Sequence, residues 1–389
     1  MTHHASTVFE TAAALLSISG TAYYLLCIWS AALFRRDCRR QASPTSSFAP
    51  PVSILKPLKG SDPEIYESFR SHCLLDYPEY EIIFGVSDPD DPAAAAVTRL
   101  QQEFPQRPIR LVVCRRTLGA NVKVSNLVQM LGEARYDHLV VNDSDIRVPH
   151  DYLHQVIAPL SDDRIGMVTC LYRGVPGPTL GSRLESVGIS TDFSGGVLAA
   201  RFIENGIQFG LGSTLAFRRR ELQSIGGFES CLDYLADDYE LGNRIHALGF
   251  KILLAPVAVD TFLPAYDWTA FFRHQLRWAR SVRDARRWGY VGLIFTFGLP
   301  WAMLNAFAHP GLRWTWLALA VVLAVRLLMA ISVGAGVMRD RFTVRLLWLV
   351  PLRDVVALLV WIASFAGNQV AWRGDSFALK DGKLARISP

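Results

Sequence analysis

The sequence contains neither of two common phosphate-binding motifs. There is no GxxxxGK[ST] motif, and no GxGxxG motif follows a predicted strand. A P-loop and a Rossmann dinucleotide site are therefore unsupported. Without a phosphate-cradling glycine loop, a bound diphosphate would have to be held by a metal ion and basic side chains.

Cysteine pairs are absent as well. No two cysteines stand in a CxxC spacing, and the six occur singly at Cys27, Cys38, Cys73, Cys114, Cys170 and Cys231. Scattered single cysteines are typical of reduced, buried thiols in a protein that faces the cytosol. They argue against a disulfide framework and against a zinc site.

The chain is rich in apolar residues. It has 389 residues, long enough for more than one core, and 51% of them are hydrophobic, with a mean hydropathy of +0.21. Soluble domains usually contain fewer apolar residues, so a membrane-embedded part is expected. The net charge of +5 is by itself a weak signal.

Residues 11–34 are predicted to form an N-terminal transmembrane helix, because they contain no charged residue over the length that a bilayer requires. Four arginines follow at once, within a linker over residues 35–51 that also contains several Ser and Pro residues. Positive residues favour the cytoplasmic side, so the following domain is expected in the cytoplasm. A cleaved signal peptide would carry its charge first and have a shorter apolar core.

The region over residues 52–268 alternates short apolar runs with helical patterns. Strands are predicted at Val52–Leu55, Ile82–Val86, Ile109–Cys114, Leu139–Val141 and Gly166–Thr169. Helices are predicted near Glu64–Leu74, Pro92–Phe104 and Val122–Leu131. This alternation indicates an α/β domain with a mostly parallel sheet. In such sheets ligands bind beyond the carboxyl ends of the strands.

The C-terminal region over residues 289–371 is predicted to contain about three membrane segments. They lie at about Val291–Ala308, Trp314–Val337 and Leu346–Gly367. Four full spans would place the tail, residues 372–389, outside, yet its basic residues favour the inside. One C-terminal segment that lies in the interface or re-enters would resolve this conflict. Arg326, inside an apolar segment, is either functional or paired with Asp354.

Carboxylates gather where two predicted strands end. Asp88, Asp90 and Asp91 follow one strand, and Asp143 and Asp145 follow another. Parallel strands would bring both groups to one edge of the sheet, where the like charges repel. Mg²⁺ or Mn²⁺ would compensate this repulsion, because these ions bind carboxylates together with substrate phosphates. The alternative is that Asp143 or Asp145 only caps the next helix or turn.

Three further features carry candidate chemistry. Lys123 opens a predicted helix and is either a diphosphate ligand or a solvated surface lysine. Asp237, Asp238 and Glu240 begin another helix after a glycine-rich turn, where a carboxylate could act as a general base or only complement the helix dipole.

Residues 269–288 are predicted to form a basic helix with interleaved aromatic residues. This pattern is typical of a helix that lies on an anionic membrane surface. Nucleic-acid binding is the competing interpretation, which the neighbouring membrane segments disfavour.

Together these motifs resemble the ceramide glucosyltransferase family of GT-A glycosyltransferases, which includes bacterial members associated with hopanoid biosynthesis. The block VSILKPLKGSDP at Val52–Pro63 is similar to the family's first strand and loop. The segments VSDPDDPA, NDSDIRV, LADDYELG and HQLRWAR are similar, in order, to three aspartate motifs and the [QR]xxRW motif. The similarity runs from about residue 51 to residue 288 and extends more loosely through both membrane regions.

The resemblance implies a role for each matching residue. Catalytic roles would fall to Asp238, as the base, and to Arg277 and Trp278. Contacts with the nucleotide sugar would come from Asp88, Lys123, Asp143 and His274, and metal ligation from Asp143 and Asp145. Two positions depart from the family pattern: His274 replaces Gln or Arg, which puts its role in doubt, and Asp145 stands where eukaryotic members have Gly.

The resemblance also implies the reaction and the partners. The protein would be an integral membrane enzyme with Mg²⁺ or Mn²⁺, a UDP-sugar donor and a lipid acceptor, in the bacterial inner membrane with its GT-A domain facing the cytoplasm. A hopanoid such as bacteriohopanetetrol with UDP-GlcNAc is favoured over ceramide with UDP-glucose. A processive polysaccharide synthase and a transporter are further alternatives. The stretch Leu180–Phe202 is expected to form the acceptor-side wall or, equally, to pack as ordinary α/β structure.

Overall fold

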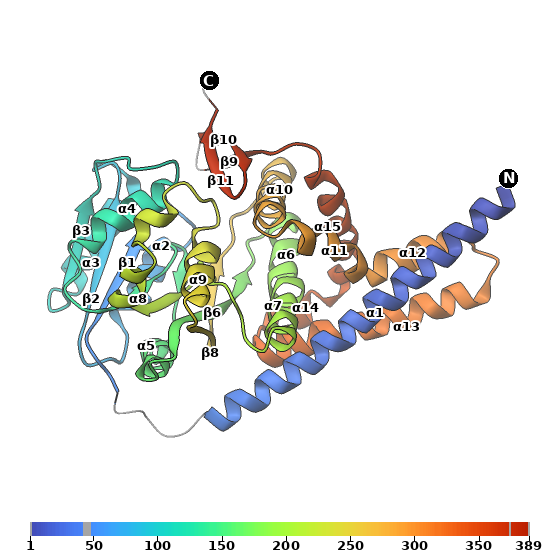
Figure 1. The fold of residues 1–389 in the computed structure, drawn as a ribbon, viewed down its shortest axis with the longest axis horizontal. Coiled ribbons are helices and arrows are strands. Elements are labelled where there is room, and N and C mark those ends of the chain that lie inside the picture. The colour runs from blue at the N-terminus through green and yellow to red at the C-terminus, as the bar shows by residue number, and fades with distance from the viewer. Residues whose placement is uncertain (1, 42–47, 373–374, 388–389) are drawn as a thin grey trace. The chain divides into compact units, whose positions relative to one another are not determined.

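The computed structural model describes residues 2–41, 48–372 and 375–387 (Figure 1). The chain forms two compact units, each built from separate stretches. The helical unit comprises Met1–Arg39, Pro176–Phe202 and Ala265–Val370. The sheet unit comprises Arg40–Val175, Ile203–Pro264 and Ala371–Pro389. The region predicted as one continuous domain, residues 52–268, thus contributes Pro176–Phe202 to the helical unit.

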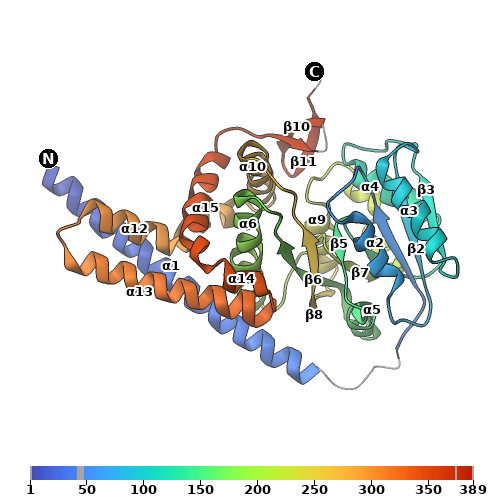
Figure 2. The same ribbon diagram turned by 180° about the vertical axis from the view of Figure 1, so that it is seen from behind.

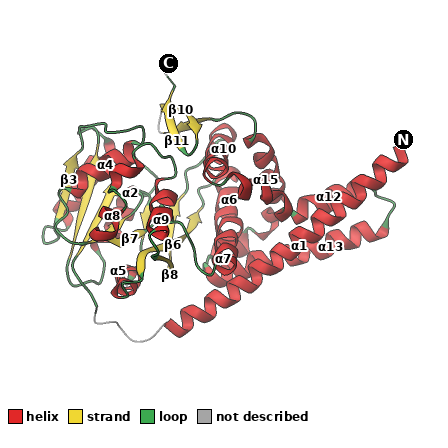
Figure 3. Ribbon diagram, in the orientation of Figure 1, coloured by secondary structure: helices red, strands yellow, loops and turns green. Residues whose placement is uncertain are grey.

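One mixed eight-stranded sheet, whose strands are yellow in Figure 3, organises the sheet unit. The strand order is β3-β2-β1-β4-β7-β6-β8-β5. Its strands are β1 (Val52–Pro57), β2 (Tyr80–Val86), β3 (Ile109–Val113), β4 (His138–Val141), β5 (Ile146–Arg147), β6 (Ile165–Val175), β7 (Leu215–Arg218) and β8 (Lys251–Phe262). β1 and β2 are buried at every position, as expected of strands covered on both faces. The five predicted strands are confirmed as β1, β2, β3, β4 and β6.

Two strands of the sheet, β7 and β5, run against the other six. β3, β2, β1 and β4 are parallel, whereas β7 runs antiparallel to β4 and to β6, and β5 runs antiparallel to β8. β6 and β8 are parallel to each other and run in the direction of β4, so six of the eight strands share one direction. The prediction of a mostly parallel sheet is confirmed, with β7 and β5 as the exceptions. β7 is buried throughout, like the parallel strands, so its apolar pattern carries no information about direction.

Six α-helices accompany this sheet in the described part of the unit. They are α2 (Ile65–Cys73), α3 (Pro92–Glu103), α4 (Val122–Leu131), α5 (Tyr152–Ile157), α8 (Arg219–Ser224) and α9 (Asp237–Ala247). The first three confirm the predicted helices. Asp91 and Asn121 start α3 and α4, because their side chains accept hydrogen bonds from Ala93 N and Val124 N. Ile54 and Phe84 of the sheet pack with Phe69 of α2 and Val97 of α3 in one core.

The helical unit contains the apolar helices. Its elements are α1 (Thr2–Gln41), α6 (Leu180–Val187), η2 (Gly188–Phe193), α7 (Ser194–Ile203), α10 (Trp268–Ala285), α11 (Arg287–Gly292), η4 (Leu293–Thr296), α12 (Gly298–Ala308), α13 (Arg313–Ala330), η5 (Ile331–Val337), α14 (Arg341–Arg345), η6 (Leu347–Leu349) and α15 (Val350–Ser364). Three stretches of the described chain are long and apolar enough to cross a membrane: Val8–Arg40, Arg313–Val337 and Leu347–Ser364. A bent pair, Arg287–Thr296 with Gly298–Ala308, makes a 48° angle and is either a broken span or a re-entrant loop.

The backbones of α1 and α12 touch within this unit (Figure 2). A Cβ atom added to Gly20 would lie 2.2 Å from the Cα atom of Gly298. No side chain fits into that space, so glycine is required on both helices. Small residues allow such close approach between membrane helices, where packing replaces the hydrophobic effect as the driving force.

A buried ion-pair cluster joins three segments of the helical unit. Arg326 of α13 is 1% exposed and donates to both carboxylate oxygens of Asp354 of α15, at 2.9 and 2.8 Å. It also donates to Asp192 of η2, and Arg353 Nε lies 3.4 Å from the other Asp192 oxygen. The alternative that Arg326 pairs with Asp354 is thus confirmed.

The basic helix α10 uses two of its arginines inside the helical unit. Arg280 donates to the carbonyl oxygens of Gln369 and Ala366, and Arg283 donates to those of Ser364 and Gly367. These carbonyls stand at and just beyond the C-terminal end of α15. Cations are favourable there because the helix dipole leaves unpaired, partly negative carbonyl groups.

The predicted tail is folded. β9 (Gln369–Trp372), β10 (Asp375–Lys380) and β11 (Lys383–Arg386) form a second sheet in the order β11-β10-β9. Asp381 and Gly382 connect β10 to β11 and both have positive φ, 52° and 77°. This is the geometry that an Asp-Gly hairpin turn favours.

We expect the replacement Arg326→Met to destabilise the protein strongly. It would leave the carboxylates of Asp354 and Asp192 buried without their main partner, which costs about 3–5 kcal/mol. The double variant Arg326→Met/Asp354→Leu should recover part of the loss, because Asp192 keeps Arg353. Thermal unfolding midpoints in detergent measure both effects. An Arg326→Met variant with the same unfolding midpoint as the wild type would contradict a stabilising role of this ion-pair cluster.

Candidate functional site

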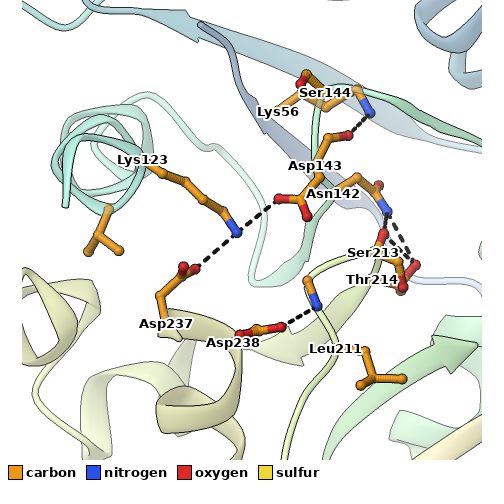
Figure 4. A network of polar contacts seen from close by, with 12 residues as sticks. Lys56, Lys123, Asn142, Asp143, Ser144, Leu211, Ser213, Thr214, Asp237 and Asp238 are labelled. Atoms are coloured by element: carbon orange, nitrogen blue, oxygen red, sulfur yellow. Dashed lines mark hydrogen bonds and ion pairs between the residues drawn. The ribbon is translucent and has the colours of Figure 1, made fainter. Parts of the chain in front are cut away.

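The carboxyl edge of the sheet carries a network of acidic and basic side chains (Figure 4). Asp143 follows β4 directly, and its Oδ1 lies 2.9 Å from Lys123 Nζ of α4. The same Lys123 Nζ lies 3.0 Å from Oδ2 of Asp237, the first residue of α9. Lys123 therefore joins the two acidic motifs that the sequence places almost a hundred residues apart.

The electrostatics of Lys123 follow from these partners. Burial alone would lower its pKa, but the carboxylates of Asp143, Asp237 and Asp238 outweigh burial and raise the pKa. The ammonium group is thus charged at neutral pH. The Lys123 side chain is 16% exposed and is paired with two carboxylates, so it is not a solvated surface lysine. That it binds a diphosphate stays a prediction.

The carboxyl group of Asp145 lies close to other negative charges. Burial first, and then the Asp143 carboxylate, raise the pKa of Asp145 to about 6. Thr261 Oγ1 donates a hydrogen bond to Oδ2 of Asp145, which opposes that effect. Asp62 adds to the negative charge from the loop after β1. A cation bound here would relieve this repulsion.

The donor atoms suit a hard divalent cation that is completed by a substrate. In the described part of the chain no group of three His, Cys, Asp or Glu side chains is placed to hold a metal ion. Mg²⁺, however, typically takes one or two carboxylates together with substrate phosphates. Asp143 and Asp145 offer two carboxylates, and a bound cation would oppose the effects that raise the pKa of Asp145, so the residues fit the predicted ion.

Asp238 stands at the start of α9 and faces the same network. The Gly212 N–H donates to its Oδ2 at 2.7 Å. Burial first, and then the Asp237 carboxylate, raise the pKa of Asp238 to about 6. A Cβ atom on Gly212 would lie 2.9 Å from an Asp143 oxygen and 3.2 Å from an Asp238 oxygen, so a side chain at this position would have to displace these two carboxylates. The glycine-rich turn thus lets Asp143 and Asp238 approach each other.

Asn142 holds this arrangement in place. It is completely buried, and its Nδ2 donates to the Ser213 carbonyl oxygen at 2.6 Å, to Tyr152 Oη at 2.9 Å and, more weakly, to Thr214 Oγ1 at 3.3 Å. The end of β4 is thereby tied to the turn that contains Gly212. Our sequence analysis missed Asn142, although a polar residue at the end of a buried apolar run was a usable signal.

Lys56 is a second residue that the sequence analysis missed. It lies in β1, is completely buried, and donates from Nζ to the backbone carbonyl oxygen of Asp143 at 2.9 Å. Burial lowers the pKa of Lys56 to about 7, against the opposing effect of Asp145, Asp143 and Asp62. A lysine within the apolar strand VSILKP was the signal that could have identified it.

The predicted acidic group after β2 divides into two parts. Asp88 is exposed, and its Oδ1 accepts a hydrogen bond from Asp90 N at 3.0 Å. Asp91 instead accepts hydrogen bonds from Gly60 N and from Ala93 N at the start of α3. Asp91 is thus the N-cap of α3, whereas the Asp88 side chain stays exposed just beyond the end of β2.

The remaining predicted residues lie on α10 of the helical unit. The His274 ring stacks on Tyr266, with centroids 5.4 Å apart, and lies 5.1 Å from the Trp278 ring. Its Nδ1 lies 3.1 Å from Oε2 of Glu185, a buried residue of α6. A carboxylate partner at Nδ1 fixes the orientation of an imidazole and directs Nε2 away from it. Arg277 belongs to the same helix.

These features can be compared with known proteins. The Glycosyl transferase family 21 model matches residues 12–385. The chain belongs to this family. It is a glycosyltransferase, as the sequence motifs predict, and the transporter alternative is thereby set aside.

Relatives within the family are distant in sequence. The chain is 23% identical over 398 residues to ceramide glucosyltransferase 1 of Caenorhabditis elegans, a match that covers 96% of this chain and 82% of the relative. Ceramide glucosyltransferase 3 of the same organism is 25% identical over 235 residues, and the match covers 60% of this chain and 51% of that protein. The chain thus spans about half of that relative. The probable glycosyltransferase YdaM of Bacillus subtilis is 26% identical over 240 residues, covering 60% of this chain and 55% of the relative.

A solved structure has the same fold. The mannosyltransferase PcManGT of Pyrobaculum calidifontis, in complex with GDP-Man and Mn²⁺, superimposes with a TM-score of 0.53 at 20% identity. The superposition covers 91% of this chain and 99% of that chain. The predicted GT-A fold with apolar helices is therefore confirmed.

We expect His72 to make the site sensitive to acid. His72 is buried beside Asn142, with Nε2 3.3 Å from Asn142 Oδ1. Burial, and then the Lys56 cation, lower the pKa of His72 well below its usual value. The unfolded chain takes up a proton below about pH 6.5 and the folded chain does not, so folding stability falls as the pH drops through that value. The loss is up to about 1.4 kcal/mol per pH unit.

Thermal unfolding at pH 7.5 and pH 5.5 tests this expectation. The variant His72→Gln should lose less stability between the two pH values than the wild type. The control His150→Gln removes an exposed histidine of the same unit and should behave like the wild type. Equal acid sensitivity of the wild type and His72→Gln would refute the assignment.

Proposed function

We propose that the protein transfers a sugar from a UDP-sugar to the hydroxyl group of a membrane lipid, with inversion at the anomeric carbon. The observation that carries this proposal is the convergence of Asp143 and Asp238 on Gly212, with Lys123 between the two acidic motifs. Donor-binding carboxylates and a candidate base lie at one edge of the sheet, as a direct displacement requires.

The donor would be bound by the residues at the ends of β2 and β4. Asp88 contacts the nucleotide, and Lys123 neutralises diphosphate charge as it now neutralises Asp143. Asp143 and Asp145 would hold Mg²⁺ or Mn²⁺, which supplies charge stabilisation for the departing diphosphate. The Mn²⁺ in the similarly folded mannosyltransferase supports a divalent ion. It does not decide between the two metals.

Asp238 would act as the general base. Its carboxylate takes the proton from the acceptor hydroxyl while that oxygen attacks the anomeric carbon and the bond to the UDP oxygen breaks. The raised pKa makes Asp238 a stronger base than an ordinary aspartate. The Gly212 N–H donates to Oδ2 and the Tyr239 N–H donates to Oδ1 at 2.8 Å. These two bonds orient the carboxylate, and each oxygen has a second lone pair that can accept the proton. A single displacement from an α-linked donor yields a β-glycoside.

The helical unit would supply the acceptor. Arg277, Trp278 and His274 lie on α10 of that unit, and the segment Leu180–Phe202, the predicted acceptor-side wall, packs there with the apolar helices. A membrane lipid has little presence in water, so its hydroxyl must be reached from the bilayer. A cytoplasmic site in the bacterial inner membrane fits the arginines that follow the first apolar helix.

The proposal also specifies the acceptor lipid and the donor sugar. A hopanoid polyol such as bacteriohopanetetrol, with UDP-GlcNAc as donor, is our first choice from sequence features. Ceramide with UDP-glucose is the second choice, and similarity to the ceramide glucosyltransferases of Caenorhabditis elegans favours it. Processive polymer synthesis is disfavoured, because only two apolar spans and one bent pair follow the first helix in the described chain.

The test is sugar transfer by the purified protein in detergent. Radiolabelled UDP-sugars, Mg²⁺ or Mn²⁺, and either bacteriohopanetetrol or ceramide are supplied, and label in the lipid phase is measured. We expect transfer to one acceptor and a loss of about 10²- to 10⁴-fold in Asp238→Asn, because general-base catalysis is removed. UDP release without glycolipid would refute both acceptors. Unchanged transfer by Asp238→Asn would refute the assigned base.

The pH profile gives a second prediction. Asp238 must be ionised to accept a proton, and its pKa is raised to about 6. The value of kcat/KM should therefore be constant near neutrality and fall about tenfold per pH unit below pH 6. Removing the neighbouring charge with Asp237→Asn should move this limb to lower pH. A limb near the ordinary aspartate pKa, about 4, in the wild type would contradict the assignment.

A further inference from the structure

We propose that the C-terminal hairpin, β10 and β11 with the turn between them, is a positioning element for Asp238. The inference rests on the proposed function. The hairpin extends by backbone hydrogen bonds onto the segment Leu232–Leu235, which leads within two residues into Asp237 and Asp238. Neither the motifs of the family nor the chemistry of the reaction requires such an element.

The contact is a short antiparallel strand pairing within the sheet unit. Tyr234 and Lys383 form a β-bridge. The Leu384 N–H donates to the Asp233 carbonyl oxygen at 2.7 Å, and the Leu235 N–H donates to the Gly382 carbonyl oxygen at 3.2 Å. The Lys383 ammonium group lies 5.5 Å from the centre of the Tyr234 ring. The hairpin therefore holds three consecutive backbone positions of the segment.

The opposite side of the same segment is tied to the start of α4. The Asn121 N–H donates to the Leu232 carbonyl oxygen at 2.8 Å, and Asn121 Nδ2 donates to the Tyr234 carbonyl oxygen at 2.7 Å. The Ala120 N–H donates to Asp233 Oδ1 at 2.9 Å. The segment is thus fixed between the start of α4, the helix that carries Lys123, and the hairpin. Loss of either partner would free the backbone before α9.

The hairpin itself is built to be rigid. Its Asp381-Gly382 turn has the two positive φ angles that match a two-residue connection. Phe377, Leu379 and Leu384 are buried, at 1%, 3% and 5% exposure. Asp375 at its start lies 3.6 Å from Lys59, in the loop after β1, but both side chains are exposed, so this ion pair adds little. The apolar contacts and backbone bonds provide the positioning.

The register of the hairpin allows one hydrogen bond to be removed alone. Leu384 pairs with Leu379 of β10, but its N–H points away from β10, toward Asp233. The variant Leu384→Pro therefore deletes the bond to Asp233 and no bond within the hairpin. The matched control Leu384→Ala keeps the N–H and loses the same buried side chain.

We expect kcat of Leu384→Pro to fall roughly 10- to 100-fold below that of Leu384→Ala, as a misplaced base predicts. KM for the UDP-sugar should stay within about twofold, because Asp143 and Asp145 follow β4 and do not depend on the hairpin. Equal kcat values in the two variants would refute the proposal. So would a parallel rise in KM, which indicates general loosening of the site.

A disulfide provides a test that does not depend on comparing two folded variants. Tyr234 and Lys383 occupy a non-hydrogen-bonded antiparallel pair, whose Cα separation of about 4.5 Å suits a disulfide. In Tyr234→Cys/Lys383→Cys/Leu384→Pro, oxidation should restore the kcat that Leu384→Pro loses, and a reductant should abolish the gain. Unchanged kcat on oxidation, with the disulfide shown by mass spectrometry, would refute the positioning role.

The wild type in the same assay distinguishes failure of the positioning role from failure of the proposed function. No sugar transfer by the wild type would refute the proposed function itself.

Discussion

Excess negative charge at the carboxyl edge of the sheet is the constraint on which the site depends. Asp143, Asp145, Asp237 and Asp238 converge there, with the Lys123 ammonium group bridging two of them. Asp238 accepts hydrogen bonds from the Gly212 and Tyr239 N–H groups, and Asp145 accepts one from Thr261. The pKa of both carboxyl groups nevertheless stays raised. The structure is thus arranged to accept more positive charge, and a diphosphate donor would increase that demand.

The sequence predicted the parts of this edge that follow from local patterns. Apolar runs that end on Asp88 and Asp143 located two strand ends correctly, and the polar start of α9 located Asp238. It could not reveal the direction of β7, because a strand buried on both faces looks the same in either direction. Asn142 and Lys56 were missed because their partners come from distant segments. The hairpin was missed although Asp381-Gly382, flanked by alternating residues, is a strong turn signal.

The helical unit handles its charges differently from the sheet unit. Arg326 is matched by Asp354 and Asp192, so its cost of burial is offset within the protein. Arg280 and Arg283 bind carbonyl groups near the end of α15, although the sequence pattern of α10 alone predicted a helix directed to anionic lipid. An amphipathic pattern shows which residues avoid an apolar core. It does not show whether these residues contact water, lipid or the end of another helix.

The hairpin also bears on how the protein is made. The sheet unit contains Ala371–Pro389, which the ribosome produces only after α15. A chain emerging from the ribosome must therefore deliver its apolar helices to the membrane while the sheet unit is still incomplete. The segment before α9 lacks one of its two partners throughout that interval. If the hairpin positions Asp238 as proposed, a chain whose synthesis stops before β10 would lack sugar transfer, even though all its apolar helices have been made.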